Sequence, residues 1–430
     1  MRATAGTANA ANTGVRDSPA VGELVTNPRV FFDLHDLPRL RERITAPPYS
    51  GWYRSIRQQV DALRRPEFYR SPEGWRRTDE WLEVRHLQRS GIAMRAAFLA
   101  ALTEEAIYRD LALLLLTDYF ADETEYWGDH SLHGRIIAQW ALTYDFLGTS
   151  LGADRQAVRE KLRRTALRLY DAKRFFLAHH LLHHANNYST RTLAGVGLCG
   201  LAIGEPVLYA TTPGAGVAED PSWVHRLPPA GAMLNALLMH QHGVVTRWPV
   251  EAARPPEELA VPYPFPEGPG YLAYSFDLYL PFYLALRRLH PDLFNPLFDL
   301  QGTPADFMCA WHLWQLQVSM PDGQRPPIKD SDGGGPLGLV LSSIYKGEDA
   351  RLFYWDATRT TVGRRDAGAR GGDIEHLCFY EPPDDLPPPG YEPPFRSAYH
   401  PVWGMAALRT GWGPEDLWDG KTFAVYAARS

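Results

Sequence analysis

Residues 85–120 read RHLQRSGIAMRAAFLAALTEEAIYRDLALLLLTDYF, and this stretch predicts the fold of the chain better than any other. Its apolar residues recur at helical spacing before and after a break near Thr103, so it predicts two consecutive helices. Residues 133–147 predict a third helix, and residues 154–176 predict a strongly amphipathic fourth. Helical hairpins are therefore the expected building unit.

Helical signals dominate from the first ordered residues to about residue 320. NPRVFFDLHDLPRLRERI (27–44) predicts an extended entry and then a helix, with Asp36 or Asp33 as its cap and Pro38 early in it. Four more helices are expected at 189–203, 230–241, 271–290 and 304–319. Because no repeat of fixed period accompanies them, the antiparallel hairpins could form a bundle, a solenoid or a toroid.

The character of the chain changes after residue 320, where turn-forming segments replace the helical pattern. Residues 381–394 are dense in proline and are expected to be extended. Residues 405–412 and 421–430 predict two consecutive strands. Two strands cannot bury a sheet face by themselves, so we expect either a fragment that stops as a β domain begins or strands that complete something smaller.

Composition limits the classes of partner. The net charge of −6 is not accompanied by a long basic run, so neither nucleic acid nor a membrane surface is an expected partner. No window is apolar enough to span a bilayer. The three cysteines are far apart and form neither a disulfide framework nor a Cys-x-x-Cys metal site. Residues 1–26 predict a disordered tail without a secretory signal.

Four histidines and two asparagines lie within residues 179–187, just before a smooth segment of small apolar residues. On a helix, residues four apart share a face. Two polar stripes result, one of His183, Asn187 and Arg191 and one of His180, His184 and Tyr188. The His-x-x-x-His spacing also suits zinc, but no HEXXH pattern is present. A zinc site, a polar ligand site and a solvated or helix-packing cluster are the alternatives.

A second candidate lies at residues 263–289, YPFPEGPGYLAYSFDLYLPFYLALRRL. A loop rich in proline and glycine leads to Tyr271 at the start of an apolar helix, and Tyr274 follows one turn later. Gly268 and Gly270 would allow backbone to approach a ligand closely. In the alternative interpretation, the loop is only a helix-entry turn and both tyrosines belong to an aromatic core.

Taken in order, five motifs resemble the heparinase II/III-like polysaccharide lyases, a family that includes oligo-alginate lyases. The motifs are NPRVFFDLHDLPRLRERI, NNYSTRTLAGVGLCGLAI, FPEGPGYLAY, RPPIKDSDGG and WGMAALRTGW. The pairing of Asn-Asn-aromatic with Glu-Gly-Pro-x-Tyr is the most distinctive part. The resemblance implies a mainly α fold, with an incomplete α/α toroid over residues 27–345. A linker and the first strands of an antiparallel β-sandwich would follow over residues 346–430.

The resemblance also implies a lyase that cleaves uronic-acid polysaccharides or oligosaccharides by β-elimination. Asn187 would neutralise the carboxylate beside the C5 proton, and Tyr271 would transfer protons. A free tyrosine titrates near roughly pH 10, so nearby cations are needed. Arg191 and either His183 or His184 are the candidates for that field. Neither a cofactor nor a bound metal is expected.

Further residues of these motifs are expected to bind the sugar. They are His183, His184, Tyr188, Arg191, Trp127, His133, Glu267 and Tyr274. Trp127 and His133 have loop packing as an equal alternative. Several relatives have a histidine where this chain has Tyr188, and the family usually draws a further catalytic histidine from its β-sandwich. His376 and His400 do not fit that pattern.

Three other functions compete with the lyase. A glycoside hydrolase on a similar toroid needs two carboxylates, for which Asp129 and Glu267 are candidates. A carbohydrate-binding protein without activity would not need a complete β-sandwich. A zinc enzyme would use the histidine cluster. Asp330 and Asp332 would hold a cation or, more simply, form an Asx-turn. The cellular location stays open, because relatives are usually exported and no export signal is visible.

Overall fold

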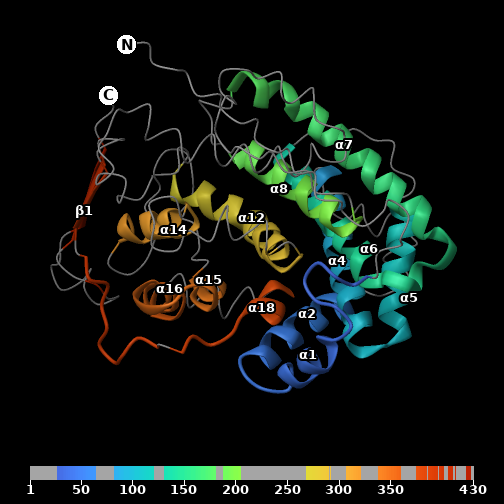
Figure 1. The fold of residues 1–430 in the computed structure, drawn as a ribbon, viewed down its shortest axis with the longest axis horizontal. Helices are drawn as coiled ribbons and strands as arrows, with labels where there is room; N and C mark the ends of the chain where they lie inside the picture. Colours follow the sequence, from blue (N-terminus) through green and yellow to red (C-terminus); the bar gives the residue numbers. More distant parts are fainter. Residues whose placement is uncertain are drawn as a thin grey trace, which may run out of the picture.

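The structure is a computed structural model that describes most of the helical part of the chain and short segments beyond it (Figure 1). The described residues are 27–63, 82–120, 130–180, 187–204, 268–289, 291, 307–320, 338–359, 374–384, 386–395, 397–400, 405–409, 412 and 423–427. The predicted tail (1–26) and the predicted helix at 230–241 lie outside them. Within the described residues the fold is mainly helical.

The helices follow the sequence pattern closely up to residue 320. They are α1 (Leu37–Arg43), α2 (Tyr49–Leu63), α4 (Leu82–Thr103), α5 (Ala106–Leu114), α6 (His130–Leu147), α7 (Arg155–His180), α8 (Asn187–Ala202), α12 (Pro269–Leu289), α14 (Phe307–Gln317), α15 (Gly338–Ile344), α16 (Gly347–Arg359) and α18 (Ile374–Phe379). Eight predicted helices that fall on described residues coincide with these within a few positions. The sequence analysis missed α2.

The break between α4 and α5 lies where the sequence predicts it. Glu104 has a φ of 62°, a left-handed conformation that is uncommon for a residue with a side chain. Two side chains satisfy carbonyls of the last turn of α4, with Thr103 Oγ1 donating to Leu99 O at 2.8 Å and Arg41 Nε to Leu102 O at 2.7 Å. These bonds end α4 and let α5 turn back as the second arm of a hairpin.

The predicted side-chain cap of the first helix is wrong. Asp36 stands at the cap position of α1 but makes no side-chain capping bond. Its Oδ2 instead accepts the backbone N–H of Asp33 at 3.0 Å and an N–H of Arg288 at 2.6 Å. Asp33 accepts the backbone N–H of His35 at 2.8 Å, which forms a turn before the helix. Asp36 therefore pairs with the charge of Arg288 and does not cap the first turn of α1.

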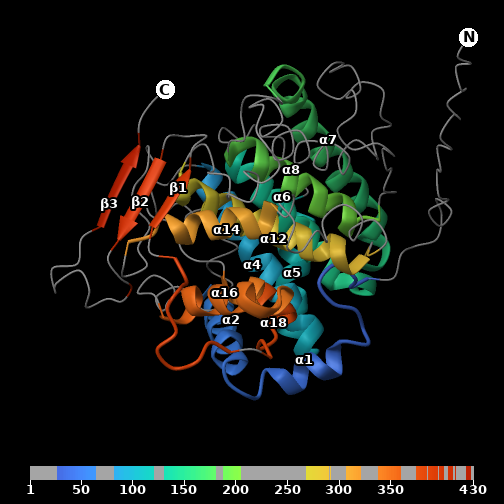
Figure 2. The same cartoon turned by 60° about the vertical axis from the view of Figure 1, so that its left-hand side comes forward.

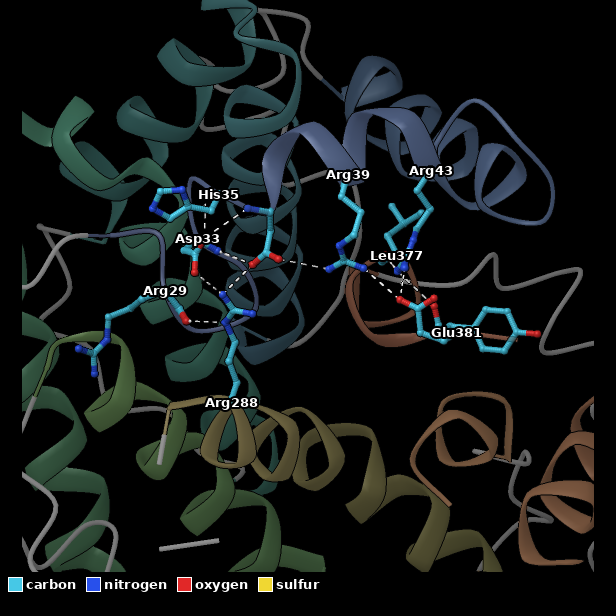
Figure 3. A network of polar contacts seen from close by, with 10 residues as sticks. Arg29, Asp33, His35, Arg39, Arg43, Arg288, Leu377 and Glu381 are labelled. Carbon is cyan, nitrogen blue, oxygen red and sulfur yellow. Dashed lines mark hydrogen bonds and ion pairs between the residues drawn. The ribbon is translucent and has the colours of Figure 1, made fainter. Parts of the chain in front are cut away.

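Asp33, Asp36 and Arg288 belong to a network of side chains that we call the clasp (Figure 3). Its members are Asp33, Asp36, Arg39, Arg43, Arg288 and Glu381. Arg39 and Arg43 of α1 both bind Glu381, which follows α18, and Arg43 also donates to Leu377 O at 3.1 Å. The clasp therefore joins the N-terminal segment, α12 and the end of α18.

The centre of the fold is formed by α4, α6, α8 and α12. Helix α6 packs against both α4 and α8, and α8 also contacts α7 and α12. In both views α12 lies between α8 on one side and α16 on the other (Figures 1 and 2). Large side chains such as Phe98, Trp140 and Phe276 are fully buried in this region. This packing brings the start of α8 against α12.

Residues 338–379 differ from the sequence prediction, which expected turns and then a linker from residue 346. The structure has α15, α16 and α18 in this region, and α18 packs against α1 and α2. Helices of six or seven residues are too short to show periodicity and are unstable alone. Burial of Ile374, Leu377 and Cys378 against the first helices stabilises α18.

Three short strands lie beside the helical body (Figure 2). They are β1 (Ser397–His400), β2 (Met405–Arg409) and β3 (Phe423–Ala427), paired antiparallel in the order β1-β2-β3. Ala407 of β2 pairs with Ala398 on one side and Val425 on the other. Strands β2 and β3 fall within the segments predicted as strands, and β1 was not predicted.

Trp412, just after β2, connects this region to the helices. Its ring lies 5.2 Å from that of Trp355 on α16 and is nearly perpendicular to it. Its Nε1 donates to Phe395 O at 3.0 Å. Burial of this indole fixes the sheet next to α16. None of the described helices combines the length and the apolar character needed to cross a membrane.

Candidate functional site

Asn187 is the first residue of α8, and its side chain is almost entirely buried. At the start of a helix the backbone N–H groups have no intrahelical partners and carry a partial positive charge. A buried amide at this point adds a further hydrogen-bond donor. The start of α8 therefore carries a partial positive charge next to the buried Asn187 amide.

Arg191 lies one turn after Asn187 and has no exposed surface. Its guanidinium sits 3.6 Å from the centroid of the Tyr274 ring, and its Nη1 donates to the Tyr274 backbone carbonyl. Burial lowers the pKa of Arg191, while the neighbouring charge of Asp277 raises it. A guanidinium stays charged in proteins. Arg191 thus binds α8 to α12 with a buried cation.

Asp277 of α12 completes a group of charges that we call the site cluster, formed by Arg135, Arg191 and Asp277. Its Oδ2 accepts a hydrogen bond from Arg135 Nη1 of α6 and lies 3.7 Å from Arg191 Nη1. Two guanidinium groups therefore share one carboxylate oxygen. The site cluster joins α6, α8 and α12 through this shared oxygen.

Two glycines allow α6 and α8 to come this close. A Cβ atom on Gly195 would overlap the backbone carbonyl of Gly134, and one on Gly134 would overlap the carbonyl of Arg191. Only glycine fits at both positions. The small residues after Asn187 are therefore a helix-packing surface, and this surface places Arg135 beside Asp277.

The start of α12 is held by backbone contacts. Gly268 has a φ of 95°, which favours glycine, and its carbonyl accepts the N–H of Leu272 at 3.1 Å. From α14, Gln315 Nε2 donates to Pro269 O at 2.7 Å. The helix-entry turn that the alternative interpretation of residues 263–289 expected is thus present. Tyr271 is partly buried and packs at the edge of the core, and Tyr274 lies one turn further on.

Several predicted site residues lie outside the described part of the chain. They are Trp127, His183, His184 and Glu267, together with Asp129, Asp330 and Asp332 of the competing interpretations. For Tyr188, only its backbone position in α8 is described. The histidine cluster, and with it the zinc alternative, therefore stays a prediction. Among the described residues, no three His, Cys, Asp or Glu side chains come together as a metal site.

Three other histidines that the sequence analysis considered lie in the described part of the chain. His133 is on α6 next to Gly134 and is almost fully buried, so it belongs to helix packing and not to a loop or an exposed groove. His376 is on α18, with its ring 5.3 Å from that of Trp52. His400 is in β1. The sequence analysis expected His133 to bind sugar; its side chain is as buried as that of Asn187, and the contact stays a prediction.

Two charged residues of the site cluster were missed from the sequence. Asp277 is the only acidic residue of α12, and Arg135 lies on the helix that was correctly predicted at 133–147. A single carboxylate in a long apolar helix is a signal that it has a partner. The partner could not be named, because Arg135 is 142 positions away in the sequence.

A second buried pair, His312 and Asp356, joins α14 to α16. The His312 Nε2 and Asp356 Oδ2 atoms are 3.3 Å apart, and the His312 ring packs edge-on against Phe353. Both side chains are buried. The pair holds two helices together inside the core, where a substrate would not reach it.

Comparison with known proteins adds no relative. No protein-family model matches the sequence, and no curated protein matches it either. The resemblance to the heparinase II/III-like lyases therefore depends on the order of the motifs and on the chemistry of the residues they contain.

Proposed function

We propose that this protein is a polysaccharide lyase that cleaves a uronic-acid-containing polysaccharide or oligosaccharide by β-elimination. In this proposal the helices form an incomplete α/α toroid, and the strands after residue 396 belong to an antiparallel β-sandwich. The observation that carries the proposal is the contact of Arg191 with Tyr274. It joins the asparagine motif of α8 to the tyrosine motif of α12.

The residue types fit the reaction. Asn187 hydrogen-bonds the C5 carboxylate and stabilises the charge that develops when the C5 proton leaves. Tyr271 transfers the protons in this reaction. The C5 proton is removed, the C4–O4 bond breaks, and the departing O4 takes up a proton. The product carries a C4–C5 double bond. This chemistry needs a hydrogen-bond donor for the carboxylate and a group that carries protons, and it needs no redox change.

In this proposal Arg191 keeps one of its two expected roles, that of a cation close to the tyrosines. A guanidinium without exposed surface that is bonded to Tyr274 does not contact a sugar directly. It acts as a positioning residue that holds α12 against α8 and contributes positive charge close to Tyr271 and Tyr274. Cations favour an ionised phenol over a neutral one.

The other predicted sugar contacts remain part of the proposal. His183, His184, Tyr188 and Tyr274 flank the two motifs, and Trp127 and Glu267 come from neighbouring loops of the sequence. The partner is an acidic polysaccharide or oligosaccharide. The partial positive charge at the start of α8 favours such a ligand.

The experiment is an ultraviolet assay with a panel of uronic polysaccharides. Elimination produces an unsaturated, ultraviolet-absorbing sugar, and we expect this absorbance to grow with at least one member of the panel. Tyr271→Phe should lower the rate by about 10²- to 10⁴-fold, because it removes the transferable proton and leaves the ring in place. Its thermal unfolding and circular dichroism should stay close to wild type.

Tyr53→Phe is the matched control, since Tyr53 is a partly buried tyrosine of α2 that contacts Arg57. It should keep the wild-type rate. A near-wild-type rate for Tyr271→Phe would remove the role of Tyr271. New reducing ends without ultraviolet absorbance would instead show hydrolysis, and binding without either product would show a non-catalytic carbohydrate-binding protein.

A further inference from the structure

Helix α7 differs in charge from the rest of the chain. It contains eight lysine and arginine residues and only two acidic residues, Glu160 and Asp171. The whole chain has a net charge of −6, so the remainder of the molecule is strongly acidic. The charge of α7 does not stand out in the sequence, because apolar residues separate the basic ones. The elimination mechanism gives this helix no part.

One side of α7 is packed and the other faces outward. Leu162 and Ala166 are fully buried, where α7 packs against α6 and α8. Arg164 and Arg168 each follow one of these by two positions, which is about 200° around a helix, and both are exposed. They are four residues apart, so they share one face and lie about 6 Å apart along the axis. We call this pair the α7 face; α7 lies at the edge of the helical body (Figure 1).

No described carboxylate neutralises the α7 face. Glu160, the acidic residue of α7 whose side chain is described, pairs with Arg163 at 3.9 Å. Within the part of the chain that the structure describes, neither Arg164 nor Arg168 makes an ion pair. A guanidinium group stays charged in proteins and binds a carboxylate through two parallel hydrogen bonds. The α7 face therefore offers two positive groups to an anion in solution.

Helix α7 runs antiparallel to α8. Near its start, Arg159 Nε donates to Ile203 O at 2.8 Å, just after the end of α8. Further along, Cys199 Sγ donates to Leu162 O at 3.8 Å. Residue numbers thus rise along α7 as they fall along α8. The second half of α7 leads toward the start of α8.

The α7 face lies within reach of a polymer that is bound at the start of α8. Asn187 is 12 residues before Cys199, so it is level with a point 12 residues after Leu162, near residue 174. Arg168 lies about 9 Å along α7 from that level, and on the outer side of a helix about 10 Å wide. A chain of several sugars spans this distance, whereas a short oligosaccharide does not.

We propose that the α7 face is a docking surface for an acidic polysaccharide chain that extends beyond the cleavage site. Arg164 and Arg168 would each bind the carboxylate of a different sugar. The inference rests on the proposed function for its ligand. A slender polyuronate touches one helix face, whereas a nucleic acid duplex or a membrane would also meet the acidic remainder of the molecule.

The double variant Arg164→Gln with Arg168→Gln removes both charges of the α7 face. At low salt, KM for the polysaccharide that is cleaved in the ultraviolet assay should rise about three- to tenfold, because each exposed ionic contact contributes little by itself. The rise should shrink at high ionic strength. KM for a trisaccharide prepared from the same polymer should not change, since the trisaccharide ends before the α7 face, and kcat should stay the same for both substrates.

Two further variants control for charge and for position. Arg164→Lys with Arg168→Lys keeps both charges and should keep KM for the polymer close to wild type. Arg54→Gln with Lys346→Gln removes two exposed positive charges elsewhere, one on α2 and one between α15 and α16. It should leave both KM values unchanged. Thermal unfolding of every variant should match wild type, because the substituted side chains are exposed.

Retention on immobilised polygalacturonate measures docking without turnover. Wild type should elute at higher salt than the double glutamine variant of the α7 face. Equal elution, or an equal rise of KM for trisaccharide and polymer, overturns the inference and leaves the lyase proposal intact. Charge-dependent retention on duplex DNA or phosphatidylserine vesicles, but not on polygalacturonate, also overturns it. A wild-type protein that shows charge-dependent retention on polygalacturonate but releases no unsaturated product from any uronic polysaccharide keeps the docking surface and overturns the lyase proposal.

Discussion

Helix α12 carries two groups of charged side chains that differ in burial, one near its end and one near its middle. Near its end, Arg288 binds Asp33 at 2.7 Å and Asp36 at 2.6 Å as part of the clasp (Figure 3). The clasp contains three carboxylates and three guanidinium groups, so its charges balance. Near the middle of α12, Asp277 of the site cluster contacts Arg135 and the fully buried Arg191. The same helix thus takes part in a partly exposed network and in one with a buried cation.

The difference between the clasp and the site cluster indicates what each can do. Although burial raises the pKa of Asp36, the N–H of Asp33 and the charges of Arg288 and Arg39 outweigh it and leave that pKa below its ordinary value. The clasp therefore stays ionised and holds distant segments together. In the site cluster, Arg191 has no exposed surface, so its contacts with Tyr274 and Asp277 are shielded from water.

The largest expected effect distinguishes Arg191, which lies on α8, from Arg288, which lies on α12. Arg191→Met should lower the free energy of unfolding by about 3–5 kcal/mol, because it removes one partner from a buried ionic group. Arg288→Met should cost about 1 kcal/mol or less, since Arg288 is partly exposed and its ion pairs are screened by water. Chemical denaturation of both variants measures the difference.

Salt gives a second measurement for this pair. The stability of wild type relative to Arg288→Met should shrink at high ionic strength, whereas the cost of Arg191→Met should change little. Equal costs for the two substitutions would show that burial does not distinguish the clasp from the site cluster.

The next largest effect concerns the packing beneath the site cluster. Gly195→Ala should cost about 2–3 kcal/mol, because its Cβ meets the backbone carbonyl of Gly134 and the two helices must separate. Separation would also move Arg135 away from Asp277, so activity should fall along with stability. Thermal unfolding and the ultraviolet assay measure the two consequences.

Gly51→Ala is the matched control for this substitution. Gly51 lies in α2, and a Cβ atom there meets nothing within 4 Å. The change should stabilise the protein by a few tenths to about 1 kcal/mol and leave activity unchanged. If Gly195→Ala behaves like Gly51→Ala, close packing of α6 and α8 is not what places the site cluster.

The smallest expected effect is a pH dependence on the clasp side of the molecule. Asp145 of α6 is fully buried and accepts the N–H groups of Arg29 and Val30 at 3.2 and 3.0 Å. Burial raises its pKa to about 7, even though these bonds and the charges of Arg29 and Arg155 act in the other direction. The folded state therefore binds a proton that the unfolded chain releases near pH 4.

This proton sets the sign of the effect. The stabilisation is complete below about pH 4 and is lost as pH rises through about 7. From pH 5 to 7 the contribution falls by about 2 kcal/mol. Asp145→Asn should remove that slope, as measured by denaturation at several pH values. A slope equal to that of wild type would assign the pH dependence to other groups.

Much of the helical arrangement could be predicted from the sequence, because long periodic segments carry their own signal. The break near Thr103 and the helix from Pro269 are examples. The cap at Asp36 was predicted wrongly because the competing cation, Arg288, is 252 positions away. Helix α18 was missed because six residues show no period and its stability comes from burial.

The residues of the candidate site also differ in whether the sequence could predict them. The motifs around Asn187 and Tyr271 could be recognised because each is local in the sequence. The carboxylate between Arg135 and Arg191 could not, since the three residues come from three separate helices.

The sequence by itself determined the helical hairpins, the glycine-rich packing segment of α8 and the residue types that suit an acidic sugar. These properties depend on neighbours within a few positions, and local geometry is enough to produce them. The tertiary structure alone decided which charges stand together, because Coulomb interactions and desolvation depend on distances in space. For this reason the contacts of Asp277 with Arg135 and Arg191 became visible only once α6, α8 and α12 were packed.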